Sequence, residues 1–279
     1  MQKIKAALIF AMTAAMLFAG CSGKSDDVPE ESPEPPTLAS PTPTPADTPA
    51  PTPTETPEPE YTGPYNPLTG LPIDEEHAET RPFAIMLNNI RDALPQQGNS
   101  QADIIYEVLA EGGITRMLGV YQSVDGVEKI GSVRSARPYY IELAMGQDAI
   151  YVHAGGSEEA YSDLSSWGTD HMDGVNGKFS SKSAGVFWRD QYRMGDRKYA
   201  YEHSLLTSGA GLEAAAESFG VSMEHADGYD CGLKFTDDGT PAGGTAAESV
   251  SVFFSSYKTG VFNYDEQTGA YLVEEYGSP

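Results

Sequence analysis

The sequence predicts a mixed α/β fold from about residue 65 and a β-rich region after residue 228. Over residues 65–220, short apolar runs typical of buried strands alternate with longer stretches typical of helices. Residues 228–279 hold only short apolar stretches between turns rich in Gly and Asp. The residues before position 65 show neither pattern. We therefore expect four parts, over residues 1–21, 22–60, 65–220 and 228–279.

The predicted strands of the α/β domain are apolar runs bounded by glycines or polar residues. The segment Ala102–Ala110 fits a strand or a helix, and Gly112 and Gly113 end it. The residues around Asp170 to Asp173 are flanked by Gly168 and Gly174 and are typical of a polar loop. The other predicted strands are Pro82–Asn88, Ile114–Gln122, Ile130–Arg134 and Ala149–His153.

Three helices are predicted from their end signals. Pro138 suits the first turn of a helix over Tyr139–Met145, because proline lacks the amide hydrogen that is unpaired there. A second helix is expected over Ser157–Leu164, with Ser157 as a possible N-cap. The third covers Thr207–Phe219, and Gly220 follows its end.

The β-rich region shows short strand patterns that continue to Tyr276 without a closing element. We expect the last sheet of this region to be incomplete and the C-terminus to be truncated. The predicted strands are Leu233–Thr236, Ser249–Phe254, Val261–Tyr264 and Tyr271–Glu275.

The charge balance excludes several classes of partner. The formal net charge is -24, from 17 Lys and Arg against 41 Asp and Glu. Nucleic-acid binding needs a basic face, and binding to anionic lipid surfaces needs a polybasic segment, so neither is expected. The chain has only two cysteines, which are too few for a disulfide framework.

The first 21 residues are typical of an export signal. Lys3 and Lys5 precede the apolar run Ala6–Ala19, which is too short for a helix of about 20 residues that spans a bilayer. The run ends in Leu-Phe-Ala-Gly before Cys21, which resembles the lipobox of bacterial lipoproteins. That resemblance implies that Cys21 is lipidated and that the mature chain starts there.

Residues 22–60 are predicted to form a disordered spacer. They hold 12 of the 20 prolines, mixed with Thr, Glu and Ser, and have almost no apolar side chains to bury. In a polyproline II conformation of ~3.1 Å per residue they would reach up to roughly 120 Å. Such a spacer would hold a folded head away from the membrane.

Several stretches together resemble one family, the YerB-type lipoproteins of Gram-positive bacteria, whose main domain has no established function. Members of this family usually continue beyond the point where this chain ends. The resemblance implies a lipid-anchored protein on the extracytoplasmic face of the cell membrane, and it supplies no reaction, ligand or catalytic residue. The stretches that carry it are Tyr65–Leu71, Arg81–Pro82, Met86–Asn89 with Pro95–Gln96, Ala102–Glu107, Glu111–Arg116, Val133–Arg137 and His153–Ser157.

Basic residues mark the first candidate site. Arg134, Ser135 and Arg137 lie between a predicted strand and a helix start, where guanidinium groups and backbone donors suit a carboxylate or phosphate. Because three predicted strands end nearby, we expect Arg116 and His153 to join them at one cleft. The alternative is that these arginines pair internally with Glu107 and Glu111.

Two patterns suit catalysis. Glu107 and Glu111 are four residues apart, which on one strand would place both carboxylates on one face as a general acid and base for a glycan. Ser157 could be a nucleophile with His153 as its base, or an ordinary helix cap with Glu158 and Glu159 complementing the helix dipole. No G-x-S-x-G motif accompanies this serine.

No metal site and no cofactor are expected. Asp170, His171 and Asp173 are the densest group of possible ligands, but their local spacing does not converge as metal ligands must. The sequence therefore favours a lipid-anchored protein whose head binds a cell-wall polymer or an envelope protein. A cell-wall hydrolase or transferase and a protein–protein scaffold without a small ligand are the alternatives.

Overall fold

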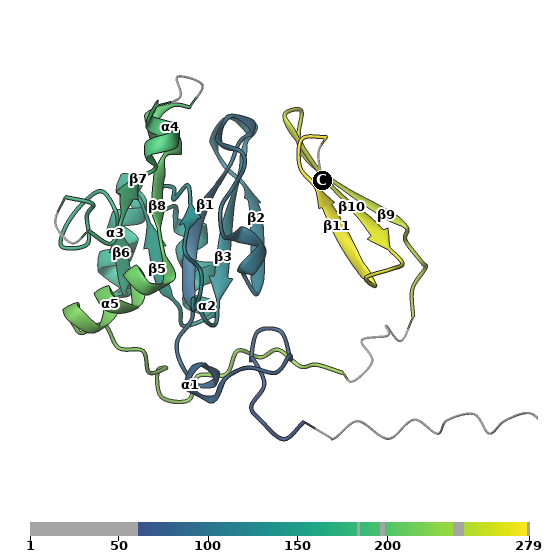
Figure 1. The fold of residues 1–279 in the computed structure, drawn as a ribbon, viewed down its shortest axis with the longest axis horizontal. Helices are drawn as coiled ribbons and strands as arrows, with labels where there is room; N and C mark the ends of the chain where they lie inside the picture. The colour runs from purple at the N-terminus through teal and green to yellow at the C-terminus, as the bar shows by residue number, and fades with distance from the viewer. Residues whose placement is uncertain (1–60, 183–184, 196–198, 237–242, 278–279) are drawn as a thin grey trace, which may run out of the picture. The chain divides into compact units, whose positions relative to one another are not determined.

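The computed structural model describes residues 61–182, 185–195, 199–236 and 243–277. The predicted export signal and spacer lie outside these residues. The main sheet has five strands in the order β2-β3-β1-β5-β6 (Figure 1). Strand β3 (Thr115–Tyr121) is antiparallel to both of its neighbours, β2 (Ile104–Leu109) and β1 (Phe83–Asn89), whereas β5 (Ile150–His153) and β6 (His171–Asp173) run parallel to β1.

Both faces of the main sheet are covered, so β1 is buried along its whole length. On one face, Ala84, Met86 and Leu118 pack with residues of helices α2 (Pro138–Gly146) and α3 (Glu158–Trp167). On the other face, Ile85 and Leu87 pack with residues near β7 (Trp188–Arg189), β8 (Leu205–Thr207) and α5 (Gly209–Phe219). This three-layer arrangement confirms the predicted mixed α/β fold.

The helix ends follow the signals in the sequence. Pro138 is the first residue of α2. The hydroxyl oxygen of Ser157 accepts a hydrogen bond from the amide of Ala160 at 3.1 Å and caps α3. Helix α5 ends at Gly220, whose φ of +64° lies in the left-handed region that favours glycine.

The remaining elements form two small sheets and short helical turns. Strands β4 (Ile130–Gly131), β8 and β7 form a sheet in that order. Strands β9 (Ser249–Ser255), β10 (Lys258–Asp265) and β11 (Ala270–Glu274) form an antiparallel sheet in the order β11-β10-β9 (Figure 1). The other elements are α1 (Glu75–Ala78), η1 (Arg91–Ala93), η2 (Asn99–Gln101), η3 (Glu111–Gly113), α4 (Gln191–Gly195) and η4 (Tyr201–His203).

Three predictions of secondary structure were wrong. Residues His171–Asp173 form β6 rather than a polar loop, because their backbone pairs in parallel with β5. Thr207 belongs to β8 rather than to the following helix. Leu233–Thr236, predicted as a strand, has no strand partner. None of the helices over the described residues combines the length and the apolar character that a bilayer span requires.

Candidate functional site

Arg116 and Arg137 pair with one carboxylate, that of Glu111, and Arg134 lies near them. Arg137 Nε pairs with Glu111 Oε1, and Arg116 Nη2 lies 3.4 Å from Glu111 Oε2. Arg134 lies close enough to be repelled by Arg116 and Arg137, and it is attracted by Glu202 and, less strongly, by Glu111. We call the three arginines and Glu111 the arginine cluster.

Three separate elements bring the arginines together. Arg116 is in β3, and its backbone is paired with β1 and β2. Arg134 lies between the middle of β1 and the end of β5, because its amide donates to Met86 O at 3.0 Å and its carbonyl accepts from Ala154 N at 2.9 Å. Arg137 is the N-cap residue of α2. The cluster therefore lies where strand ends meet a helix start.

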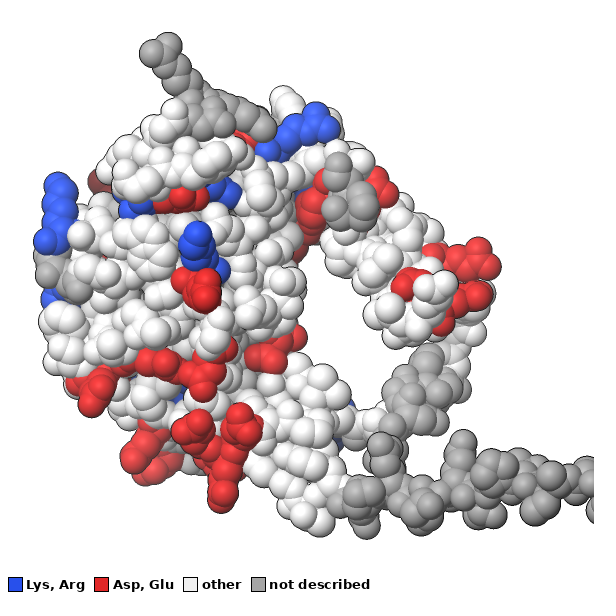
Figure 2. All heavy atoms as spheres, viewed as in Figure 1, with Lys and Arg blue, Asp and Glu red and all other residues white. Residues whose placement is uncertain are grey.

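The arginine cluster has more positive than negative charge. Burial, followed by repulsion from Arg137, lowers the pKa of Arg116. Burial, followed by repulsion from Arg116, also lowers the pKa of Arg134. The hydrogen bond from Arg137 lowers the pKa of Glu111, which keeps that carboxylate ionised. Glu111 thus pairs with two of the guanidinium groups and Glu202 attracts the third, so positive groups still outnumber negative ones, on a head whose visible face carries acidic patches (Figure 2).

Two guanidinium nitrogens of the cluster have no partner among the described residues. Arg116 Nε and Arg134 Nε are both buried without an acceptor. Arg116 is 5% exposed, and its Nη1 donates to the carbonyl of Ser135 at 3.0 Å. Arg134 donates only a long bond, of 3.4 Å, to the carbonyl of Glu202. A buried donor without an acceptor is unfavourable, so the cluster has unused capacity for an anion.

His153 takes part in a buried network rather than lining a cleft. The ring is fully buried, and Nδ1 lies 2.8 Å from the carbonyl of Gly155. Its Nε2 lies 2.9 Å from Nδ1 of His171. Because a carbonyl can only accept, Nδ1 carries the proton and Nε2 accepts from His171. Burial lowers the pKa of His153 to about 4, so the ring is neutral at pH 7.

Asp173 organises the loop that follows β5, a role that sequence reasoning missed. Its carboxylate accepts from the amides of Gly155 and Val175, each at 2.8 Å, and from the hydroxyl of Tyr161 at 2.6 Å. The only signal in the sequence was the polar segment from Asp170 to Asp173. Its composition predicts a loop, and only the structure shows that it pairs with β5 as a strand.

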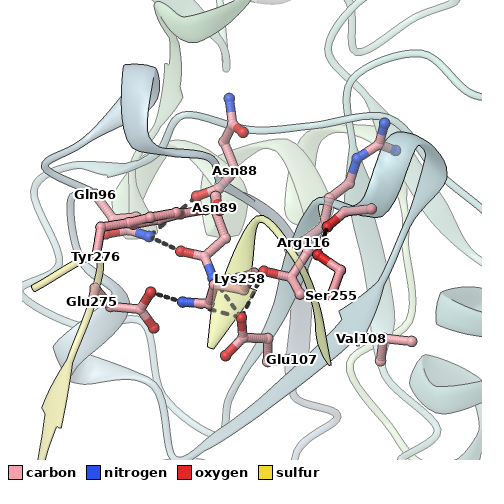
Figure 3. A network of polar contacts seen from close by, with 12 residues as sticks. Asn88, Asn89, Gln96, Glu107, Val108, Arg116, Ser255, Lys258, Glu275 and Tyr276 are labelled. Carbon is pink, nitrogen blue, oxygen red and sulfur yellow. Dashed lines mark hydrogen bonds and ion pairs between the residues drawn. The ribbon is translucent and has the colours of Figure 1, made fainter. Parts of the chain in front are cut away.

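Glu107 binds a different set of residues from Glu111. Its Oε1 accepts from Asn89 Nδ2 at 2.8 Å and from Thr115 Oγ1 at 2.6 Å. It also lies 3.3 Å from Nζ of Lys258, which in turn pairs with Glu275 Oε2 (Figure 3). Lys258 is 2% exposed, and burial lowers the pKa of its ammonium group. Sequence reasoning missed Lys258, because a lone lysine at a strand start has no distinctive pattern.

The structure does not bring Glu107 and Glu111 into a facing pair. Strand β2 ends at Leu109, and Glu111 follows in η3, where Gly112 has a φ of +72°. The alternation of side chains along the strand therefore stops before Glu111. One carboxylate contacts Lys258, and the other contacts two arginines.

One group of possible metal ligands lies elsewhere on the described surface. Ligand atoms of Glu76, His77 and Asp125 all lie within 4.8 Å of one another, and both carboxylates are exposed. His77 Nε2 already lies 2.9 Å from Asp125 Oδ2, so these two side chains are hydrogen-bonded to each other.

A family of proteins shares this domain. The sequence profile described as "Protein of unknown function (DUF3048) N-terminal domain" matches residues 68–222. This chain belongs to that family, which confirms the resemblance noted in the sequence.

A relative and a solved structure agree with this assignment. "Putative lipoprotein YerB" of Bacillus subtilis (strain 168) is 40% identical over 158 residues, which are 57% of this chain and 44% of the relative. The match thus spans less than half the length of that relative. The crystal structure of YerB protein from Bacillus subtilis superimposes with a TM-score of 0.63 at 34% identity, covering 77% of this chain and 67% of the other.

Proposed function

We propose that this chain is a lipid-anchored extracytoplasmic protein whose head binds an anionic polymer of the cell envelope at the arginine cluster. The observation that carries the proposal is the grouping of three guanidinium groups, two of which pair with Glu111, with Arg116 Nε and Arg134 Nε unpaired. The lipid anchor is proposed from the sequence around Cys21 and from the relative's description as a lipoprotein.

The chemistry of the cluster favours phosphate or carboxylate groups. Guanidinium groups form paired, charge-assisted hydrogen bonds with both kinds of anion. Helix α2 begins next to Arg137 and adds the positive end of its dipole, although its first residue, Pro138, has no amide hydrogen to donate. An anion would also relieve the repulsion that lowers the pKa values of Arg116 and Arg134.

The alternative of a hydrolase or transferase has less support. Glu107 and Glu111 contact separate sets of residues, and Ser157 caps a helix through its hydroxyl. His153 is fully buried and bonds to Gly155 and His171. None of these groups forms a pair of the kind that acid–base or nucleophilic catalysis needs.

A panel of polymers tests the proposed function. The full chain in nanodiscs of neutral lipid is titrated with poly(glycerol phosphate), poly-γ-glutamate and neutral dextran. We expect one of the two anionic polymers to bind and dextran not to bind. Binding should weaken as salt increases, since the contacts are between charges. Equal binding of dextran, or no binding of either anionic polymer, would contradict the proposal.

A further inference from the structure

A second candidate site lies on the opposite face of the main sheet, between that sheet and the sheet β9–β11. A cavity of about 820 Å³ opens there, within the size range of ligand sites, which is roughly 300–1,000 Å³. One wall includes Ile105, Glu107 and Met117, and the other includes Phe262, Val273 and Glu275. Most of this lining is apolar, and the carboxylates are its charged groups.

The strand registers explain why these side chains share the cavity. Ile105 and Glu107 are two residues apart in β2 and therefore point to the same face, and Met117 of β3 is paired with Glu107. Phe262 of β10 is paired with Val273 of β11. Glu275 comes two residues after Val273, so its side chain continues the same face.

The charged end of the cavity has an excess of negative charge. Glu107 and Glu275 share Lys258 as a cationic partner (Figure 3). Glu107 Oε1 has further donors in Asn89 and Thr115. Glu275 Oε1 is buried and has no donor among the described residues. The unsatisfied acceptor thus belongs to Glu275, and the excess negative charge belongs to the two carboxylates that share one lysine.

We infer that this cavity binds a small amphipathic amine, with its ammonium group at Glu275 and its apolar body between Ile105, Met117 and Phe262. An ammonium group supplies both the missing donor and the missing positive charge. A neutral alcohol supplies only a donor, and a carboxylate would be repelled. This site differs from the arginine cluster in its face and in the sign of its ligand.

Three probes of matched shape test the inference on the full chain in neutral nanodiscs. They are cyclohexylmethylamine, cyclohexylmethanol and cyclohexanecarboxylate. Binding is followed by the NMR signal of methyl-labelled Met117, which lines the cavity. The signal of Met145, which is exposed and lines a different cavity, serves as an internal control. We expect the amine to shift the Met117 signal with an affinity on the order of tenfold above that of the alcohol. The carboxylate should leave the signal unchanged.

Two matched variants locate the ammonium group. In Glu275→Gln the amine should lose its advantage and bind about as the alcohol does, while alcohol binding persists. In Glu274→Gln, whose side chain lies on the other face of β11, both affinities should stay unchanged. The inference is overturned if the amine leaves Met117 unaffected or if the carboxylate binds equally well. It is also overturned if Glu275→Gln abolishes the binding of both amine and alcohol, since Glu275 would then only hold the sheet in place.

Discussion

Arg116 and Met117 are neighbours in the chain, yet they belong to different sites. Side chains alternate between the faces of a strand, so Arg116 points toward the face covered by α2, and Met117 points toward the 820 Å³ cavity. In Figure 3 the side chain of Arg116 points away from Glu107. For the same reason Glu107 cannot neutralise the arginine cluster, and this leaves Glu111 as the carboxylate paired with it.

At the residue scale, we predict that His153 makes the stability of the head depend on pH. Above pH 6.5, the ordinary pKa of histidine, the ring is neutral in both the folded and the unfolded chain. The contribution of the ring to the free energy of unfolding is then fully present. As the pH falls, the unfolded chain takes up the proton first. The free energy of unfolding then decreases until the folded pKa of about 4, by about 3 kcal/mol in all.

Burial also lowers the pKa values of His171 and His203, so urea denaturation between pH 7 and pH 4 measures the contribution of His153 only as the difference between the unchanged protein and a His153 variant. His171, Asp173 and Tyr161 contact or face the ring, and the lowered pKa of Asp173 places its own effect below pH 3.8. The variant His153→Asn should be less stable at pH 7 but should lose less stability on acidification. Parallel curves for the two proteins would show that His153 does not titrate in this window.

How far the sequence predicts individual site residues depends on how unusual each residue is. In a chain with so few basic residues, Arg134 and Arg137 stand out, and the structure places them beside Arg116. Lys258 and Glu275 could not be found, because Lys258 meets Glu275 across two paired strands and meets Glu107 of the main sheet only through tertiary packing.

At the scale of elements, helices with clear end signals were predicted best. Pro138, Ser157 and Gly220 each mark an end through local backbone chemistry, which sequence alone reveals. Strands β6 and β8 have three residues each, too few for an alternating pattern. They exist because neighbouring strands pair with them, and that pairing is a tertiary effect.

We predict that Ser157→Ala destabilises α3 without changing anion binding. The substitution removes the hydroxyl that accepts from the amide of Ala160, and the loss of such a cap costs about 1 kcal/mol. Thermal unfolding and titration with the anionic polymer measure the two effects on the same protein. Weaker binding at unchanged stability would instead place Ser157 in contact with the ligand.

We predict that Lys258→Met loosens the sheet β9–β11 from the head. Removing the ammonium group leaves Glu107 and Glu275 close together without their shared cation, at a cost of about 3–5 kcal/mol. Hydrogen exchange in β10 should accelerate. In the triple variant Lys258→Met, Glu107→Gln, Glu275→Gln, slow exchange should be largely restored, because no buried charge remains. Fast exchange in the triple variant would mean that Lys258 acts through packing rather than charge.

At the scale of the whole molecule, the acidic composition and the arginine cluster have to be considered together. The net charge of -24 would repel anionic polymers at a distance. Binding therefore depends on a local site where guanidinium groups outnumber carboxylates. An anchored head would also meet envelope polymers at high local concentration, which offsets a modest affinity.

We predict that Cys21→Ala releases the protein from the membrane or leaves it unprocessed. The cysteine ends an apolar run that is too short to anchor the chain by spanning the bilayer. Membrane fractionation of cells fed a labelled fatty acid tests this, with Cys231→Ala as the matched control. Lipid label on the Cys21→Ala protein equal to that of the unchanged protein would contradict the proposed anchor.

The affinity of Arg134→Gln for the anionic polymers tests the central claim most directly. Arg134 has an unpaired Nε and only a long contact to Glu202, so its replacement should leave the fold intact. We expect the affinity of the full chain for the bound polymer to fall by about 1–3 kcal/mol, roughly 10- to 100-fold. Lys129→Gln removes the same charge from an exposed position and should change the affinity less than about twofold. Equal losses in the two variants would mean that only net charge matters, and an unchanged affinity in Arg134→Gln would mean that the arginine cluster is not the binding site.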